Sequence, residues 1–142
     1  MFDKAPVLFI DNEGKWYADE VHMFRMDIVK LFSEHLVLQK DGSYSVEWDG
    51  KKYPVKVEDV PFVIDELIIN DEETVKARLT DSRIIDFVPK QISGNGDVVH
   101  VELFNGLDTR FSRKAQWQLN DYIKEENGEM YLVFGNNRFK IS

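Results

Sequence analysis

The sequence predicts an α+β fold in which two repeated units, each made of antiparallel β-hairpins and one helix, pack as a single compact protein. Hydrophobic residues make up 43% of the 142 residues, which supplies a core. Short runs with strand periodicity are accompanied by two helical patterns. Matched residue types also recur 86 or 87 positions apart: Phe24 with Phe111, Ile28 with Ala115, Phe32 with Leu119, Leu36 with Ile123, Gly42 with Gly128, Val46 with Leu132, Trp48 with Phe134, Tyr53 with Phe139 and Val55 with Ile141.

The repeat defines the expected organisation of the chain. A first β-plus-helix unit spans residues 1–62, connecting strands and a loop span 63–97, and a second β-plus-helix unit spans 98–142. No stretch has the composition of a long flexible linker. One compact domain and two closely packed halves therefore both fit the sequence.

The first unit is predicted as strands around a single amphipathic helix. Apolar residues at helical spacing, from Ile28 to Leu36, indicate the helix. Asp49-Gly50 predicts a tight hairpin, because its turn needs positive φ angles that glycine tolerates. The expected elements are strands at 7–10 and 15–17, a helix at 25–37, and strands at 44–48 and 52–57.

The remaining elements are predicted from the same kinds of pattern. Residues 83–88 fit a short strand or a helical turn, and residues 89–97 fit a mobile loop or a wide hairpin. Ser112 is a suitable N-cap for a helix that runs to about Lys124. The other expected elements are strands at 62–69, 75–79, 99–103, 130–134 and 139–141.

Charge and composition limit the function classes. The net charge is −8, and residues 1–71 carry 8 Lys or Arg against 15 Asp or Glu. An acidic protein repels phosphate backbones, so nucleic-acid binding is disfavoured. Without cysteine the chain has no disulfide and no thiolate site. The first residues do not resemble a signal peptide and no apolar run is long enough to span a bilayer, so we expect a cytoplasmic protein with no membrane partner.

The segment 57–62, Val-Glu-Asp-Val-Pro-Phe, resembles a bacterial protein family of unknown function, DUF1285. Similar stretches lie at residues 14–17, 28–32, 41–44 and 107–113. The resemblance implies a bacterial protein with a repeated β-plus-helix motif, a role in signalling or ligand binding, and no known enzymatic activity. Trp48-Asp49 stand where the family usually has Thr-Pro, and Phe24 and Met26 replace a Thr and a Pro. Any family site at these positions is altered here.

Glu58 and Asp59 form the first candidate site. Two carboxylates facing a cleft can anchor a ligand or act as an acid/base pair. Adjacent residues in an extended chain, however, point to opposite faces, so a turn cap or a pair with an arginine is the alternative.

Arg110 and Arg113 form the second candidate site. They are expected one turn apart at the start of a helix, where they can hold an anion together with the N-terminal amides. The alternatives are a surface ion pair with Asp108 and a buried pair with the Glu58-Asp59 segment that joins the two repeats.

The remaining candidates are aromatic residues and histidines. Trp48 and Trp117 are candidate apolar ligand contacts, and Trp117 lies off the apolar stripe of its helix, so we expect it to be exposed. The spacing of His22, His35 and His100 gives no zinc pattern, and no metal site is expected.

The sequence therefore favours a non-enzymatic ligand-binding or protein-interaction module, and it identifies no cofactor. A small anionic ligand or a protein partner is expected at a cleft between the units, with Glu58, Asp59, Arg110 and Arg113 as polar contacts. The alternative is an uncharacterised hydrolase that uses Glu58 or Asp59 as its base. A homo-oligomer is a further alternative.

Overall fold

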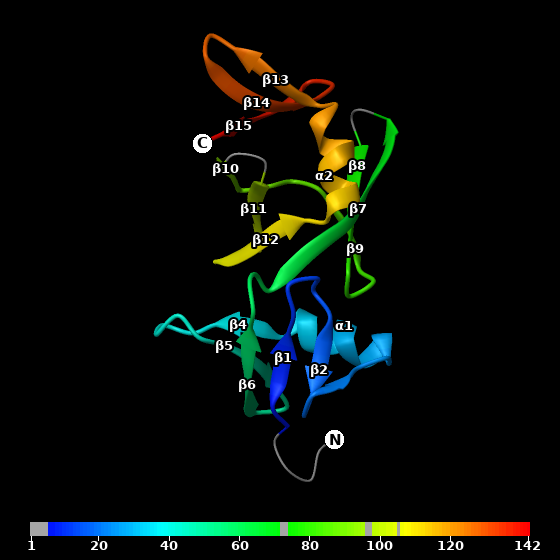
Figure 1. Cartoon of the computed structure of the whole chain (residues 1–142), viewed down its shortest axis with the longest axis vertical. Helices are drawn as coiled ribbons and strands as arrows, with labels where there is room; N and C mark the ends of the chain where they lie inside the picture. Colours follow the sequence, from blue (N-terminus) through cyan, green and yellow to red (C-terminus); the bar gives the residue numbers. More distant parts are fainter. Residues whose placement is uncertain (1–5, 72–73, 96–97, 105) are drawn as a thin grey trace. The chain divides into compact units, whose positions relative to one another are not determined.

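The structure, a computed structural model, describes residues 6–71, 74–95, 98–104 and 106–142. The chain divides into two compact units, Met1–Pro61 and Phe62–Ser142 (Figure 1). Each unit has its own mixed sheet, and the described residues contain two helices. The chain is therefore a β-rich α+β protein, which confirms the predicted class.

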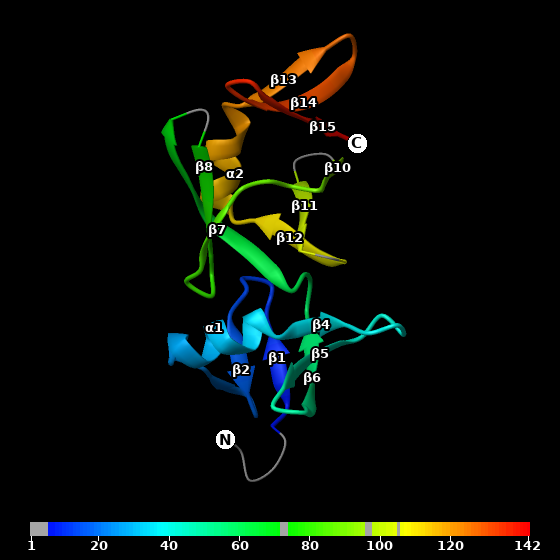
Figure 2. The ribbon, with the colours of Figure 1, turned by 180° about the vertical axis from the view of Figure 1, so that it is seen from behind.

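The first unit has one helix against one sheet (Figure 2). The strands lie in the order β3-β2-β1-β6-β5-β4, and β1 and β6 are parallel while the other neighbours are antiparallel. The elements are β1 (Leu8–Ile10), β2 (Trp16–Ala18), β3 (Val21–His22), α1 (Met26–Glu34), β4 (Leu36–Leu38), β5 (Tyr44–Trp48) and β6 (Lys51–Val57).

Alternation along the strands builds the core of the first unit. Leu8, Ile10 and Trp16 are buried, and α1 contributes Phe32, whose ring centroid lies 6.0 Å from that of Trp16. The β5–β6 hairpin turns at Asp49-Gly50, whose φ angles of 53° and 71° confirm the predicted tight turn.

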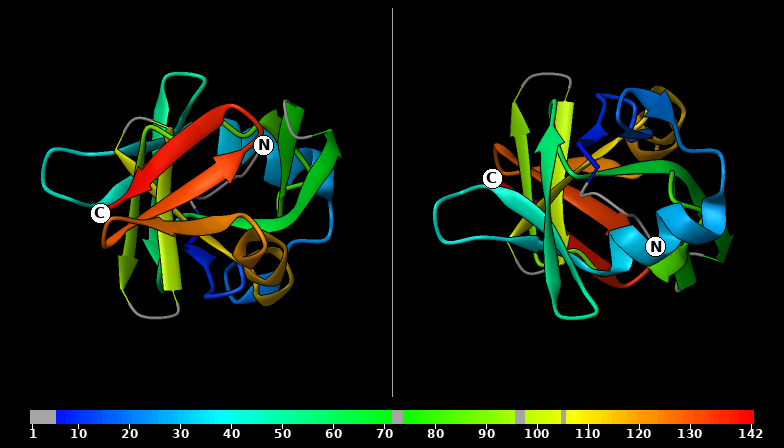
Figure 3. Two further views of the ribbon diagram at one scale, coloured as in Figure 1. Left: turned by 90° about the horizontal axis from the view of Figure 1, so that it is seen from above. Right: turned by 90° about the horizontal axis from the view of Figure 1, so that it is seen from below.

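The second unit is larger, and its last three strands are seen from above in Figure 3. The strand order is β13-β14-β15-β10-β11-β12-β7-β8-β9, with parallel pairing of β10 with β15 and of β12 with β7. The elements are β7 (Phe62–Asp71), β8 (Thr74–Leu79), β9 (Ile84–Asp86), β10 (Gln91–Asn95), β11 (Val98–Phe104), β12 (Leu107–Phe111), α2 (Arg113–Asn120), β13 (Ile123–Glu126), β14 (Glu129–Phe134) and β15 (Asn137–Ile141).

Both helices are shorter than the sequence predicts. Helix α1 ends at Glu34 instead of 37, and α2 ends at Asn120 instead of about 124. Leu36 and Ile123 continue the helical spacing, but each begins a strand and pairs across it, Leu36 with Val46 and Ile123 with Leu132. A residue that is apolar at the end of a helical pattern also fits the buried face of a strand, so periodicity does not separate the two.

The segment between the expected repeats is part of the second sheet. Residues 84–86, left open as strand or helical turn, form β9. Gln91–Asn95, expected in a loop or wide hairpin, form β10 and pair with β11. Residues 96 and 97, which lie between β10 and β11 in the sequence, are outside the described residues, as is Asn105 of the expected 105–106 turn.

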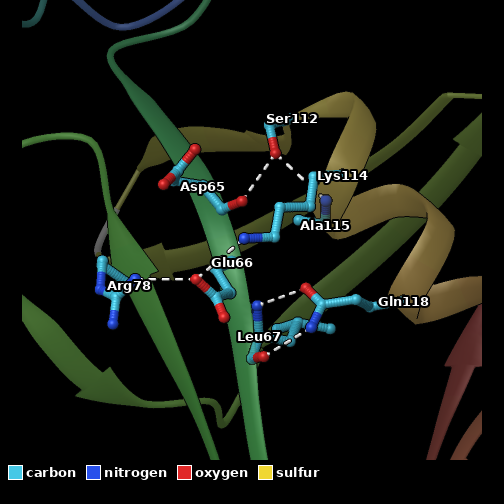
Figure 4. Close-up of polar contacts among 8 residues, drawn as sticks. All are labelled: Asp65, Glu66, Leu67, Arg78, Ser112, Lys114, Ala115 and Gln118. Atoms are coloured by element: carbon cyan, nitrogen blue, oxygen red, sulfur yellow. Dashed lines mark hydrogen bonds and ion pairs between the residues drawn. The ribbon is translucent and has the colours of Figure 1, made fainter.

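Strand β7 is held to α2 by side chains that take the place of a neighbouring strand (Figure 4). Its pairing with β12 is restricted to residues 62–64. Beyond that point the Gln118 carboxamide accepts a hydrogen bond from the Leu67 N–H and donates one to the Leu67 carbonyl, both at 2.8 Å. The Ser112 hydroxyl donates to the Asp65 carbonyl at 2.8 Å and accepts from the Ala115 N–H at 3.1 Å, which confirms the predicted N-cap. We call these contacts the β7–α2 clamp.

An ion-pair group lies beside the clamp. The Glu66 carboxylate accepts from Arg78 of β8 at 2.8 Å and from Lys114 of α2 at 3.1 Å. Lys114, and to a lesser degree Arg78, hold the pKa of the Glu66 carboxyl below its usual range. The charged form of Glu66 is therefore favoured in the folded chain.

We expect Gln118→Ala to lower the free energy of unfolding by about 1–3 kcal/mol, because it leaves both polar groups of Leu67 without their side-chain partner. Urea unfolding followed by circular dichroism measures this change. Gln116→Ala is the matched control, since Gln116 bonds the exposed Asn120 side chain on the same helix. Equal effects of the two substitutions would contradict the clamp.

We expect the stabilising effect of Glu66 to depend on pH. Because its pKa is lower in the folded than in the unfolded chain, its contribution is present above the unfolded value of about 4.3 and is lost as the pH falls through the folded value. The difference in stability between the natural chain and Glu66→Gln should therefore shrink on acidification. Urea midpoints across acidic pH measure it, with Glu125→Gln as an exposed control in the same unit. A difference that stays constant would show that the charge is not involved.

Candidate functional site

The six residues predicted as ligand contacts lie in both units. Trp48, Glu58 and Asp59 belong to the first unit, and Arg110, Arg113 and Trp117 belong to the second. Each group is described within its own unit. A shared site formed by all six stays a prediction.

Glu58 stabilises a turn of the first unit. Its backbone N–H donates to the Ile10 carbonyl at 2.9 Å, and its carboxylate accepts from the Asn12 N–H at 2.6 Å. Both Glu58 and Asp59 are exposed, at bends that come after β6. The contact with Asn12 corresponds to the turn-cap alternative for Glu58.

Arg110 and Arg113 do not share a helical turn. Arg110 lies on β12, where it is half-buried and donates to the Phe111 carbonyl at 3.2 Å. Arg113 is the first residue of α2 and is exposed. The expectation placed both on the helix, but the Ser112 cap starts α2 only after Arg110, because the strand pairs through Arg110 and Phe111 with β7.

The tryptophans differ in exposure. Trp48 ends β5 and is half-buried, while Trp117 on α2 is 71% exposed, which confirms the expectation for Trp117. Among the described residues, no group of three or more His, Asp or Glu side chains is placed to hold a metal ion. No described helix has the length and apolar character that crossing a membrane requires.

A hollow of about 420 Å³ in the second unit is the strongest candidate site. One wall comes from β8, β9 and the two residues after β9, and the other comes from β14 and β15. These strands lie toward opposite ends of the second sheet, so the sheet curls until the two ends share one cavity. The lining residues are Thr74, Val75, Asp86, Phe87, Val88, Phe134, Asn137 and Phe139.

The hollow has an aromatic floor and a polar rim. The buried rings of Phe87 and Phe134 meet edge to face, with centroids 6.0 Å apart. Asp86 is paired with Lys76 at 2.8 Å, so its charge is partly compensated, while Thr74 and Asn137 are neutral. The arrangement favours an apolar ring held by a few hydrogen bonds.

A smaller hollow of about 200 Å³ lies over β10, β11 and β12. Its lining is mostly polar and includes Gln91, Ser93 and Glu102. His100 bonds Asp108 across it, with 3.1 Å between Nδ1 and Oδ2. The volume of this smaller hollow is below that usual for a ligand pocket. The larger hollow, which we call the aromatic hollow, is therefore the better candidate.

The aromatic hollow was not predicted from the sequence. The sequence placed Phe134 and Phe139 in predicted strands and left open the structure of the segment that contains Phe87. Alternation in β14 and β15 identifies inward rings, whereas the approach of β9 to β14 depends on how far the sheet curls. No local pattern in the sequence reports that curvature.

Two solved structures share this architecture. The first, a DUF1285 family protein from Shewanella baltica OS155, has a TM-score of 0.69 and 21% identity over 82% of this chain and 91% of that chain. The second, a DUF1285 family protein from Silicibacter pomeroyi DSS-3, has a TM-score of 0.74 and 18% identity over 99% of this chain and 81% of that chain. This chain has a DUF1285-like fold.

The DUF1285-like fold confirms the resemblance that the sequence motifs predicted. The most specific motif, residues 57–62, runs from the last residue of β6 to the first residue of β7. No protein-family profile matches the sequence, and no curated protein matches it.

We expect Glu58→Ala to speed hydrogen exchange at the Asn12 amide, because the substitution removes its carboxylate acceptor. Amide exchange followed by NMR measures this change. Glu13→Ala is the matched control, since Glu13 lies in the same turn and its carboxylate pairs with the Lys15 ammonium at 3.3 Å, whereas the Asn12 N–H donates to Glu58. If both variants leave the Asn12 amide unchanged, the capping role of Glu58 is wrong.

Proposed function

We propose that this protein is a non-enzymatic ligand-binding module whose ligand occupies the aromatic hollow of the second unit. The observation that carries the proposal is the hollow itself, which has a volume within the range of small-molecule sites and a floor of phenylalanine rings. A role in signalling and a cytoplasmic location, as expected from the sequence, are part of the same proposal.

The lining supports a neutral or cationic ring compound. Asp86 is the charged residue among the side chains that line the hollow, and neither Arg110 nor Arg113 is among them. A small anion at this site meets a carboxylate and apolar rings. The anionic ligand expected from the sequence, with Arg110 and Arg113 as its polar contacts, therefore remains a separate proposal.

The hydrolase alternative has less support. It requires Glu58 or Asp59 as a base in a cleft. The Glu58 carboxylate is exposed and accepts a hydrogen bond from the Asn12 N–H, which favours a structural role for this residue.

The proposal includes the repeated-unit interpretation. It is supported by an antiparallel meander after each helix, β4-β5-β6 after α1 and β13-β14-β15 after α2. The last strand of each meander also pairs in parallel with an earlier strand, β6 with β1 and β15 with β10. Under this interpretation, β8 and β9 belong to the segment between the repeats. Because these strands form one wall of the hollow, the first unit has no counterpart of it.

We expect neutral or cationic aromatic compounds to raise the melting temperature of the full chain in a thermal-shift screen. A ligand at 100 times its dissociation constant stabilises the folded state by about 2.7 kcal/mol. Phe139→Ala should abolish the shift, because Phe139 lines the hollow and is only partly buried, so its loss spares most of the core.

Trp117→Ala is the control, since Trp117 is an exposed aromatic residue of the same unit and does not line the hollow. A hit that survives Phe139→Ala lies elsewhere and contradicts the proposal. A screen without any hit against neutral or cationic rings also contradicts it.

A further inference from the structure

Strands β10 and β15 are parallel neighbours over only a short part of their length. Ile92 lies opposite Ile141. One residue further on, the Ser142 N–H donates to the Ile92 carbonyl and the Ser142 carbonyl accepts from the Gly94 N–H, both at 3.1 Å. Within the described part of the chain, this pairing reaches no further back than Ile141 of β15. The earlier residues of β15, 137–139, therefore pair with β14 on one side and have an open edge on the other.

The aromatic hollow lies along this open edge. Asn137 and Phe139 of β15 line it from one side, and residues 86–88, which precede β10 in the chain, line it from the other. Two segments that are joined at Ile92 and Ile141 are thus separated by about 420 Å³ of space nearer the start of β15. Strand β9 is the last strand of the sheet, so each wall of the hollow includes a strand edge.

The backbone of Arg138 faces the open edge. Successive residues of a strand direct their N–H and C=O groups alternately to its two sides. Since Ser142 bonds β10, the backbone groups of Arg138, four residues earlier, point to that same side. The Arg138 side chain leaves the edge clear, because its guanidinium pairs with Glu126 of β13 and lies over the Tyr131 ring of β14, 4.7 Å from the centroid. A backbone donor and acceptor are therefore presented beside the hollow.

We propose that the ligand of the aromatic hollow is an extended peptide segment of a partner protein, which adds a strand to the open edge of β15. This inference rests on the proposed function and names the class of its ligand. The peptide backbone bonds the N–H and C=O of Arg138, and alternate side chains of the peptide point to the face of the sheet that carries Phe139. One of these side chains is aromatic and lies against the rings of Phe87 and Phe134, which line the hollow.

Charge complementarity selects the rest of the peptide. Asp86 is the charged residue among the side chains that line the hollow, and its side chain is 72% exposed although Lys76 pairs with it at 2.8 Å. A lysine or arginine two positions from the aromatic residue lies on the same face of the peptide, toward this carboxylate. The chain itself carries a net charge of −8, which disfavours a second copy as the occupant. A segment that combines an aromatic and a basic residue fits the site.

The test measures binding of a fluorescein-labelled peptide, Thr-Phe-Thr-Lys-Thr with blocked ends, to the full chain by fluorescence anisotropy. The natural chain should bind it, and serine in place of the peptide's phenylalanine should weaken binding at least tenfold. Arg138→Pro should weaken binding about tenfold, because it removes the N–H that bonds the peptide at an edge position where proline is tolerated. Arg138→Ala is the matched control, since it keeps the N–H and removes the side chain, and it should bind as the natural chain does.

Hydrogen exchange at the Arg138 amide of the natural chain, followed by NMR, gives a second test that does not depend on the proline variant. Saturating peptide should slow exchange at this amide about tenfold and leave the amides of the first unit unchanged. Circular dichroism and urea midpoints establish whether Arg138→Pro is folded. Equal binding of the peptide by the natural chain and a folded Arg138→Pro overturns the inference, and so does an Arg138 amide that the peptide leaves unprotected.

The failure of this inference is distinct from that of the proposed function. If aromatic compounds stabilise the natural chain but not Phe139→Ala, and the peptide does not bind, the hollow is a ligand site and only the peptide inference is wrong. If neither the compounds nor the peptide bind, both are wrong. A dimer in sedimentation experiments that Arg138→Pro abolishes and Arg138→Ala keeps would assign the open edge to a second copy and would also overturn the inference.

Discussion

The second unit depends on how the long strand β7 completes its hydrogen bonds after it leaves β12. Beyond Ile64 that edge of the strand faces α2, and the Gln118 carboxamide pairs with both polar groups of Leu67 as a neighbouring strand does. Buried backbone groups without partners are costly, so α2 has to lie here. Ser112 fixes the start of α2, because its hydroxyl donates to the Asp65 carbonyl and also accepts from the Ala115 N–H as the N-cap.

The position of α2 determines the path of the C-terminal strands. The chain leaves the helix at Asn120 and enters β13, and the meander ends with β15 paired to β10. Phe134 is thereby buried against Phe87, and the space beside these two rings is the aromatic hollow. A polar clamp on one side of β7 thus supports an apolar site built from other strands.

Local patterns predicted much of this fold, because turns and alternation depend on neighbouring residues. The Asp49-Gly50 hairpin and the Ser112 cap arise from the conformations that those residues favour. The predicted C-terminal ends of the helices were wrong, because Leu36 and Ile123 fit the buried face of a strand as well as that of a helix. The candidate site was less predictable. Phe87 and Phe139 are far apart in the sequence, and their shared hollow depends on sheet curvature that no local pattern encodes.

We conclude that the clamp holds β7 and α2 together as part of one cooperative second unit. Native-state hydrogen exchange at the Leu67 amide tests this conclusion most directly, because this N–H bonds a side chain instead of a strand. We predict that the amide opens only with global unfolding, at the same free energy as the slowest amides of β14. Exchange at the rate of an exposed loop amide would contradict the conclusion.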